Sequence, residues 1–131
     1  MSDKLKIMVV EDNPINLKLV GDLLEIEGFE VQVCADAEIA LEALKTIKPD
    51  LILMDVALPG MDGLELTRVL KADKKTKDII IVALTAFAMK GDKEKVLGAG
   101  CNGYITKPIE TRKFKEQILQ YLLKGHNDER L

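Results

Sequence analysis

Acidic side chains follow two of the short apolar segments of this chain, and carboxylates in such positions are able to support metal or phosphoryl chemistry. Glu11 and Asp12 come directly after an apolar run at 7–10, and Asp55 comes directly after a run at 51–54. Clustered carboxylates repel one another and raise one another's pKa unless a cation lies among them. Oxygen ligands without a nearby histidine or cysteine suit Mg²⁺, with Mn²⁺ as a substitute, better than they suit zinc.

A hydroxyl and an ammonium group follow two further apolar segments. Thr85 comes after a run at 79–84, and Lys107 follows a short run at 104–105. A carboxylate beside Mg²⁺ is able to attack phosphorus as a nucleophile, which gives an aspartyl phosphate. A lysine and a threonine would then stabilise the charge on the phosphoryl oxygens, which is most of what phosphoryl transfer requires of a protein. These residue types together predict phosphoryl transfer to a carboxylate.

The segments that must position these side chains alternate between strand and helix patterns. The runs at 7–10, 51–54 and 79–84 are nearly continuous apolar stretches, as in strands buried on both faces of a parallel sheet. Val31 and Val33 alternate with polar residues, which predicts an edge strand, and 104–105 predicts a fifth strand. The first of five helices is expected to pack through the apolar stripe Ile15, Leu19, Leu23 and Ile26, and the others are expected near 37–47, 66–70, 89–97 and 114–122.

Five strands alternating with five helices predict an α/β fold, in which a five-stranded parallel sheet lies between two layers of helices. The expected strand order is 2-1-3-4-5, the flavodoxin-like three-layer αβα sandwich, because the alternating second run suits an edge. Ligands of such sheets bind outside the carboxyl ends of the strands, where the strand order reverses. The acidic residues, Thr85 and Lys107 should therefore meet at one edge of the sheet.

Composition fits one globular domain and excludes several classes of partner. The chain has 131 residues, of which 47% are hydrophobic and 31% charged, and its formal net charge is −3. We expect a domain at 1–124 with a short polar tail at 125–131, no direct nucleic-acid partner and no membrane insertion. Cys34 and Cys101 are expected to be buried free thiols in a reducing cytoplasm.

Four segments, VVEDN, LILMDVALPGMDG, ALTA and YITKP, resemble the signature motifs of response-regulator receiver domains. The resemblance extends over 5–123. It implies that Asp55 accepts a phosphoryl group, that Asp12 binds Mg²⁺ directly, and that Glu11 binds it largely through water. It also implies that the backbone carbonyl of Ala57 is a further ligand.

The same resemblance implies roles for the residues near the end of the chain. Lys107 would contact the phosphoryl group, and its bond to Pro108 would be cis. Thr85 would hydrogen-bond the new phosphoryl oxygen, and Tyr104 would change rotamer in response. Many receivers carry a polar side chain where this chain has Ala57, so the lifetime of the phosphoryl group stays open.

The function implied by the resemblance is a cytoplasmic switch of a two-component system or phosphorelay, which catalyses only its own phosphorylation and dephosphorylation. His126 is the only histidine, so the donor would be a sensor histidine kinase/phosphatase or a histidine phosphotransfer protein. Effectors would bind the face formed by the fourth helix, the fifth strand and the fifth helix, near Phe87, Met89 and Tyr104. A relay intermediate and a terminal effector both fit. Some strings, such as VEDNPINLKLV, are similar to those of stand-alone receivers that regulate cell division and to those of receivers fused to hybrid kinases.

Three alternative interpretations are weaker. An aspartyl-nucleophile phosphatase of the haloacid dehalogenase type would carry a second aspartate where Ala57 stands, and an adaptor with a decayed site would have lost Asp55 or Lys107. The glycines at 98–103 formally match a dinucleotide-binding fingerprint, but they lead into a strand rather than out of one.

The lysine-rich segment 71–78 is expected to be a solvated face.

Overall fold

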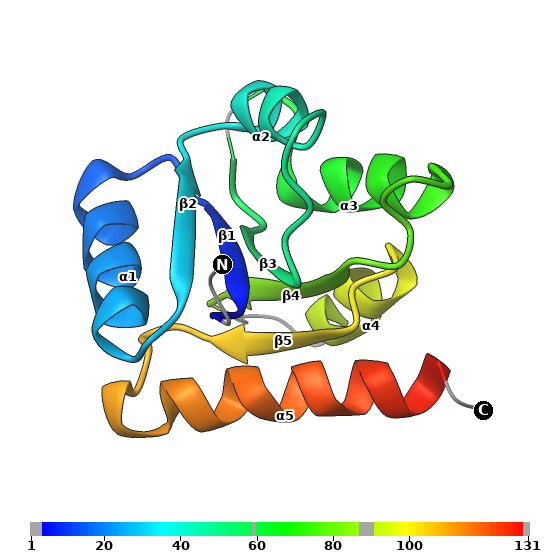
Figure 1. Cartoon of the computed structure of the whole chain (residues 1–131). Coiled ribbons are helices and arrows are strands. Elements are labelled where there is room, and N and C mark those ends of the chain that lie inside the picture. The colour runs from blue at the N-terminus through cyan, green and yellow to red at the C-terminus, as the bar shows by residue number, and fades with distance from the viewer. Residues whose placement is uncertain (1–3, 59, 87–90, 130–131) are drawn as a thin grey trace.

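Five parallel strands form one sheet in the computed structural model, which describes residues 4–58, 60–86 and 91–129 (Figure 1). The strand order is β2-β1-β3-β4-β5, as the sequence predicted. In chain order the elements are β1 (Lys6–Val10), α1 (Pro14–Ile26), β2 (Glu30–Cys34), α2 (Ala37–Ala43), β3 (Leu51–Asp55), α3 (Gly63–Ala72), β4 (Ile80–Thr85), α4 (Asp92–Gly98), β5 (Gly103–Thr106) and α5 (Thr111–Glu129).

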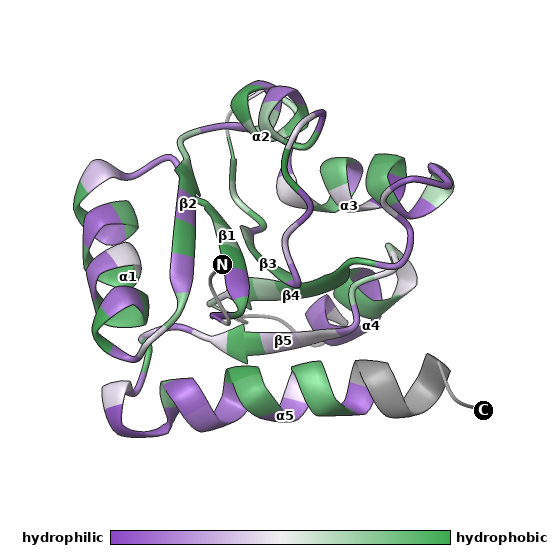
Figure 2. Cartoon of the chain, viewed as in Figure 1, coloured by the Kyte–Doolittle hydropathy of each residue, from purple (hydrophilic) through white to green (hydrophobic). Residues whose placement is uncertain are grey.

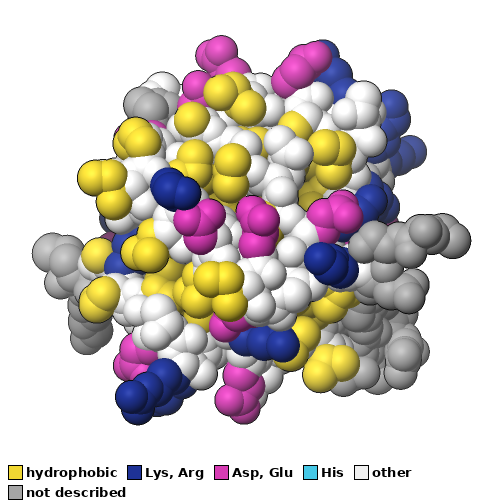
Figure 3. All heavy atoms as spheres, turned by 60° about the vertical axis from the view of Figure 1, so that its left-hand side comes forward, with side chains coloured by type: hydrophobic (Ala, Val, Ile, Leu, Met, Phe, Trp, Pro, Cys, Tyr) yellow, Lys and Arg dark blue, Asp and Glu magenta, His cyan; other side chains and the backbone are white. Residues whose placement is uncertain are grey.

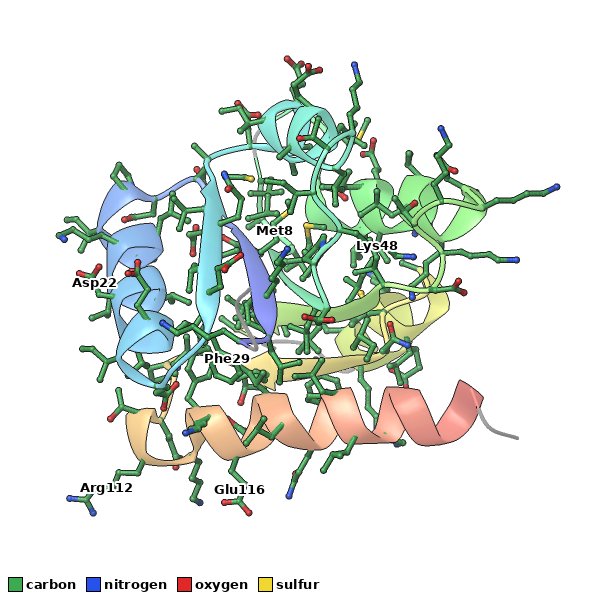
Figure 4. The ribbon with its side chains drawn as sticks, viewed as in Figure 1. Met8, Asp22, Phe29, Lys48, Arg112 and Glu116 are labelled. Atoms are coloured by element: carbon green, nitrogen blue, oxygen red, sulfur yellow. The ribbon has the colours of Figure 1, made fainter. Side chains whose placement is uncertain are left out.

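Helices cover both faces of the sheet, so the predicted three-layer sandwich is confirmed. The pair α1 and α5 lies on one face, and α2, α3 and α4 lie on the other (Figure 1). Successive residues of a central strand enter opposite layers: Met8 packs with the layer of α2, α3 and α4, whereas Ile7 packs with the layer of α1 and α5. The fully buried strands β3 and β4 are correspondingly hydrophobic, whereas the edge strand β2 alternates between hydrophobic and hydrophilic residues (Figure 2). Figure 4 shows Met8 pointing into the interior and Arg112 pointing away from it.

The face through which α1 packs differs from the prediction. Ile15, Leu19 and Ile26 are 78%, 62% and 83% exposed, whereas Val20 and Leu24 are buried against the sheet. The helix carries two apolar stripes, and helical spacing alone gives no reason to prefer one of them as the buried face. Of the stripe that we expected in the core, Leu23 packs against it as predicted, whereas the other three residues lie largely in solvent.

Helix ends follow local rules that the sequence carries. Asn13 caps α1, since its side-chain oxygen accepts hydrogen bonds from the backbone N–H groups of Ile15 and Asn16 at 2.9 and 3.1 Å. Asp36 caps α2, because its Oδ1 atom accepts a hydrogen bond from the N–H of Ile39 at 2.8 Å. Gly28 follows α1 with φ +99°, a left-handed conformation that glycine adopts at little cost.

Helix α5 continues beyond the end suggested by its apolar stripe. It runs to Glu129, and Leu122 is its last buried residue among the side chains that the structure describes, which end at Lys124. A stripe marks where a helix is packed, and no proline follows here to end the helix. The division between a domain at 1–124 and a tail at 125–131 stays a prediction. Among the described residues, we find no helix with the length and apolar character that crossing a membrane requires.

Lys71 corrects the expectation of a fully solvated lysine-rich segment. Its Nζ atom donates hydrogen bonds to the carbonyl oxygens of Lys77 and Ile79, at 3.1 and 2.7 Å, and to Oδ1 of Asn102 at 2.9 Å. This half-buried ammonium group joins α3 to the beginnings of β4 and β5. Charge density along the segment does not distinguish a lysine that folds back onto backbone carbonyls from one that extends into water.

Candidate functional site

The carboxyl ends of the strands bring the predicted acidic residues together. Glu11 and Asp12 follow β1, and Asp55 ends β3, the central strand of the sheet. One carboxylate oxygen of each lies within 4.8 Å of the others. In Figure 3, acidic side chains gather in the middle of the face shown, with hydrophobic side chains around them. The three carboxylates therefore meet at the carboxyl ends of the strands, as the predicted topology requires.

Lys107 follows β5, at one edge of the sheet, and its side chain reaches this cluster. Its Nζ atom lies 3.3 Å from Oε1 of Glu11 and 3.3 Å from Oδ2 of Asp55. Its backbone N–H donates to the carbonyl oxygen of Thr85 at 2.8 Å, which fixes the segment after β5 against the end of β4. The peptide bond between Lys107 and Pro108 is cis, as the motif implied.

Asp55 is buried and in close contact with the backbone of Ala57 and Gly63. It is 4% exposed, and its Oδ1 accepts a hydrogen bond from the N–H of Ala57 at 3.0 Å. Gly63, the first residue of α3, passes directly behind it, and a Cβ atom there would overlap the carbonyl oxygen of Asp55. One carboxylate oxygen therefore contacts a backbone donor, while the other faces Lys107.

Glu11 is almost fully buried, and its surroundings change its acidity. Its Oε2 accepts from the N–H of Asn13 at 3.2 Å, and its own N–H donates to the carbonyl of Cys34 at 3.1 Å. Burial raises the pKa of the Glu11 carboxyl above its usual value, and a hydrogen bond to the Asp55 carboxyl acts in the same direction. Glu11 therefore holds its proton to a higher pH than an isolated glutamate would.

Thr85 and Tyr104 lie where a signal could leave this cluster. Thr85 is buried at the end of β4, one residue beyond Leu84, which pairs with Asp55 of the neighbouring strand. Tyr104 lies in β5 and packs on the layer formed by α2, α3 and α4. Their switch roles, like the roles of Ala57 and the acidic residues as ligands, stay predictions at this point.

The donor set fits a hard divalent cation. Among the described residues, the cluster offers three carboxylates and one ammonium group, which leaves an excess of negative charge. Carboxylate oxygens are the ligands that Mg²⁺ prefers. Asp12 is the exposed member of the three, so a metal at this cluster would be reached from solvent.

An apolar groove of about 460 Å³ runs from this cluster along α1. Leu19, Val20 and Leu23 line it on the α1 side, and Pro108 and Ile109 line it on the side of the loop before α5. Glu11 and Lys107 lie among its lining residues as well. Leu19, which belongs to the exposed stripe of α1, thus lines the same groove as Glu11 and Lys107.

Two site residues escaped the sequence analysis. Asp62 was given no role from the sequence, and it caps α3 by accepting a 2.8 Å hydrogen bond from the N–H of Glu65. Its position just before a helical pattern was the signal that could have found it. Gly63 gave no such signal, because its need for a small residue comes from the carbonyl of Asp55, which only the fold brings close.

The doubly wound sheet has a buried aspartate at the end of its central strand, an acidic pair after the first strand and a lysine after the last. This is the arrangement expected of a receiver domain. The comparison with protein families agrees: residues 7–119 match the response regulator receiver domain, and the chain belongs to this family. It is 47% identical over 116 residues to the polar-differentiation response regulator DivK of Brucella anthropi. That match covers 88% of this chain and 94% of the relative, and DivK of Brucella melitensis matches to the same degree.

Solved structures agree in fold. A putative response regulator from Chloroflexus aurantiacus superposes with a TM-score of 0.87 at 29% identity, over 92% of this chain and 99% of that one. The receiver domain of the sensor histidine kinase PA1611 from Pseudomonas aeruginosa superposes with a TM-score of 0.83 at 34% identity, over 91% and 98% of the two chains. That structure has a magnesium ion coordinated in its active-site cleft. Receiver domains act as phospho-accepting switches and interact with histidine kinases, phosphotransfer proteins and effectors.

Proposed function

We propose that this protein accepts a phosphoryl group from a partner's phosphohistidine onto Asp55, in the presence of Mg²⁺, and signals by binding other proteins according to its phosphorylation state. The observation that carries the proposal is the position of Asp55. It is the one buried carboxylate of the described chain that ends a central strand and lies 3.3 Å from a lysine ammonium group.

The chemical step needs one bond made and one broken. An Asp55 carboxylate oxygen bonds to phosphorus while the phosphorus–nitrogen bond of the donor breaks. The electron pair of that bond stays on the imidazole nitrogen, which takes up a proton. We assign Lys107 and the hydroxyl of Thr85 to the phosphoryl oxygens, because both lie at the strand ends that surround Asp55.

The metal ligands in this proposal are Asp12, Asp55, the backbone carbonyl of Ala57 and, largely through water, Glu11. When bound, Mg²⁺ neutralises charge on the carboxylates and on the incoming phosphoryl group. The excess of carboxylates over ammonium groups supports this assignment, as does the magnesium ion in the related receiver of PA1611. Mn²⁺ should substitute, because it accepts the same oxygen ligands.

The donor docks, in our proposal, on the exposed stripe of α1 and the groove beside it. Ile15 and Leu19 are large apolar side chains that remain exposed on α1, and Leu19 lines the groove that Glu11 and Lys107 also line. Exposed apolar patches of this kind are typical of protein interfaces. A sensor histidine kinase/phosphatase or a histidine phosphotransfer protein that covers this patch would present its phosphohistidine to Asp55.

The output surface in this proposal is the face made by α4, β5 and α5. Tyr104 belongs to the described part of that face, whereas Phe87 and Met89 lie outside the described residues. The protein would catalyse only its own phosphorylation and dephosphorylation, in the cytoplasm, where buried free thiols such as Cys34 and Cys101 stay reduced. A relay would pass the group from Asp55 to a second histidine protein, and a terminal effector would not.

The test is incubation with a small acyl phosphate and Mg²⁺, followed by intact-mass measurement. Wild type should gain one phosphoryl group, and Asp55→Asn should gain none while it keeps the circular dichroism of the folded protein. Lack of a mass gain in wild type would contradict the proposal. Release of a small phosphate ester's phosphate with many turnovers would instead favour a phosphatase.

A further inference from the structure

Tyr121 of α5 binds the backbone of the neighbouring Tyr104 through a single hydroxyl group. The hydroxyl donates a hydrogen bond to the carbonyl oxygen of Tyr104 at 2.9 Å and accepts one from the N–H of Tyr104 at 3.2 Å. Strand β5 is the last in the sheet order, so its outer edge has no strand partner among the described residues. A helix side chain thus satisfies an amide and a carbonyl that another strand would normally bind.

Gly103 provides the space for this arrangement. A Cβ atom at Gly103 would overlap the ring of Tyr121, so the ring lies against the backbone of β5. Tyr121 packs with the layer of α1 and α5, whereas the Tyr104 side chain packs with the layer on the opposite face. Residue 104 is therefore held by one helical layer through its backbone and by the other through its side chain.

The same strand leads directly into the phosphorylation site. In the register between β4 and β5, Tyr104 lies opposite Ala83, and Thr106 lies opposite Thr85. The next residue, Lys107, donates its N–H to the Thr85 carbonyl and places its ammonium group beside Asp55. A displacement of Thr85 or Lys107 therefore acts on the backbone that Tyr121 binds.

We propose that Tyr121 is a positioning residue for the switch: its hydroxyl ties the backbone of Tyr104 to α5, so that a rearrangement of β5 is transmitted to the helix. The inference rests on the proposed phosphorylation of Asp55 for its biological meaning, but the physical link is present without phosphorylation. The hydrogen bonds of the Tyr121 hydroxyl therefore couple β5 to α5 on the proposed output face.

The experiment compares wild type with Tyr121→Phe, which keeps the ring and removes both hydrogen bonds. Tyr104→Phe is the matched control, because the Tyr121 hydroxyl binds the backbone of residue 104 and not its side chain. Without phosphorylation, amide hydrogen exchange at residue 104 should become about three- to tenfold faster in Tyr121→Phe and stay near the wild-type rate in Tyr104→Phe. An unchanged exchange rate in Tyr121→Phe would overturn the link.

A second measurement distinguishes transmission of a rearrangement from β5 to α5 from a mere loss of local stability in β5. After treatment with acyl phosphate and Mg²⁺, wild type should show NMR shift changes at 103–106 and also at 117–123 of α5. Tyr121→Phe should gain the same mass and keep the changes at 103–106, with those in α5 reduced at least about twofold. Equal α5 changes in both proteins would overturn the inference. If the proposed function is wrong, wild type will gain no mass. The exchange rate at residue 104 would still show whether the Tyr121 hydroxyl binds the backbone of Tyr104.

Discussion

The ammonium nitrogen of Lys107 lies 3.3 Å from the Oδ2 atom of Asp55, across the carboxyl end of the sheet. The same nitrogen lies 3.3 Å from Glu11, so a single cation balances part of the charge of the acidic cluster. A bound divalent ion would meet both the attraction of the carboxylates and the repulsion of this lysine. The two effects can be separated by substitution.

Lys107→Met should increase the stabilisation that Mg²⁺ gives, because the variant loses the positive charge that opposes the ion. Without Mg²⁺ the variant should be less stable than wild type by about 1–3 kcal/mol, since charged hydrogen-bond partners are lost. Asp12→Ala should instead weaken the stabilisation by Mg²⁺. Thermal unfolding with and without the ion measures all three effects. Identical melting curves for wild type with and without Mg²⁺ would contradict the assigned ligands.

Ile15→Ser and Leu19→Ser should leave the free energy of unfolding within about 0.5 kcal/mol of wild type, because both side chains are mostly exposed. Phosphorylation by a small acyl phosphate should also be unchanged. Transfer from a phosphorylated donor protein should fall about tenfold or more, since the donor would lose buried apolar contacts. Val69→Ser, which changes an apolar side chain that is 44% exposed on α3, is the control. Unimpaired transfer to both α1 variants would show that the donor docks elsewhere.

Gly63→Ala and Gly98→Ala should change stability in opposite directions. A Cβ atom at Gly63 would overlap the backbone of Asp55, so this variant should lose about 1–3 kcal/mol. Nothing lies within 4 Å of a Cβ at Gly98, and alanine there should stabilise α4 by about 0.5–1 kcal/mol. Urea unfolding measures both. A neutral Gly63→Ala would mean that α3 does not press on the backbone of Asp55.

The pH dependence of stability should reveal Glu11. Its pKa is raised in the folded protein above the usual 4.5, so the folded state holds the proton more tightly than the unfolded state. Stability therefore falls as pH rises from about 4.5 through the raised pKa, and this contribution should be missing from Glu11→Gln. Urea midpoints of both proteins in a chelator, measured from acid to neutral pH, test this. Parallel curves for the two proteins would mean that Glu11 titrates normally.

The sheet could be predicted from the sequence because strands buried on both faces need nearly unbroken apolar runs. The site followed from the topology: once the strand order was fixed, the residues after the strands had to meet, and Asp12, Asp55 and Lys107 do. The exposed stripe of α1 was misassigned, because periodicity cannot distinguish an apolar face that packs inside from one that remains for a partner. Gly63 and Tyr121 act through close approaches between successive elements, and no local sequence pattern indicates these contacts.

The most direct measurement is to locate the added phosphoryl group after incubation with acyl phosphate and Mg²⁺. Peptide mass mapping at a pH where acyl phosphates survive should place the group on the peptide that contains Asp55. A chelator or Asp55→Asn should abolish the signal. A phosphoryl group on another residue, or one that persists in Asp55→Asn, would contradict the account.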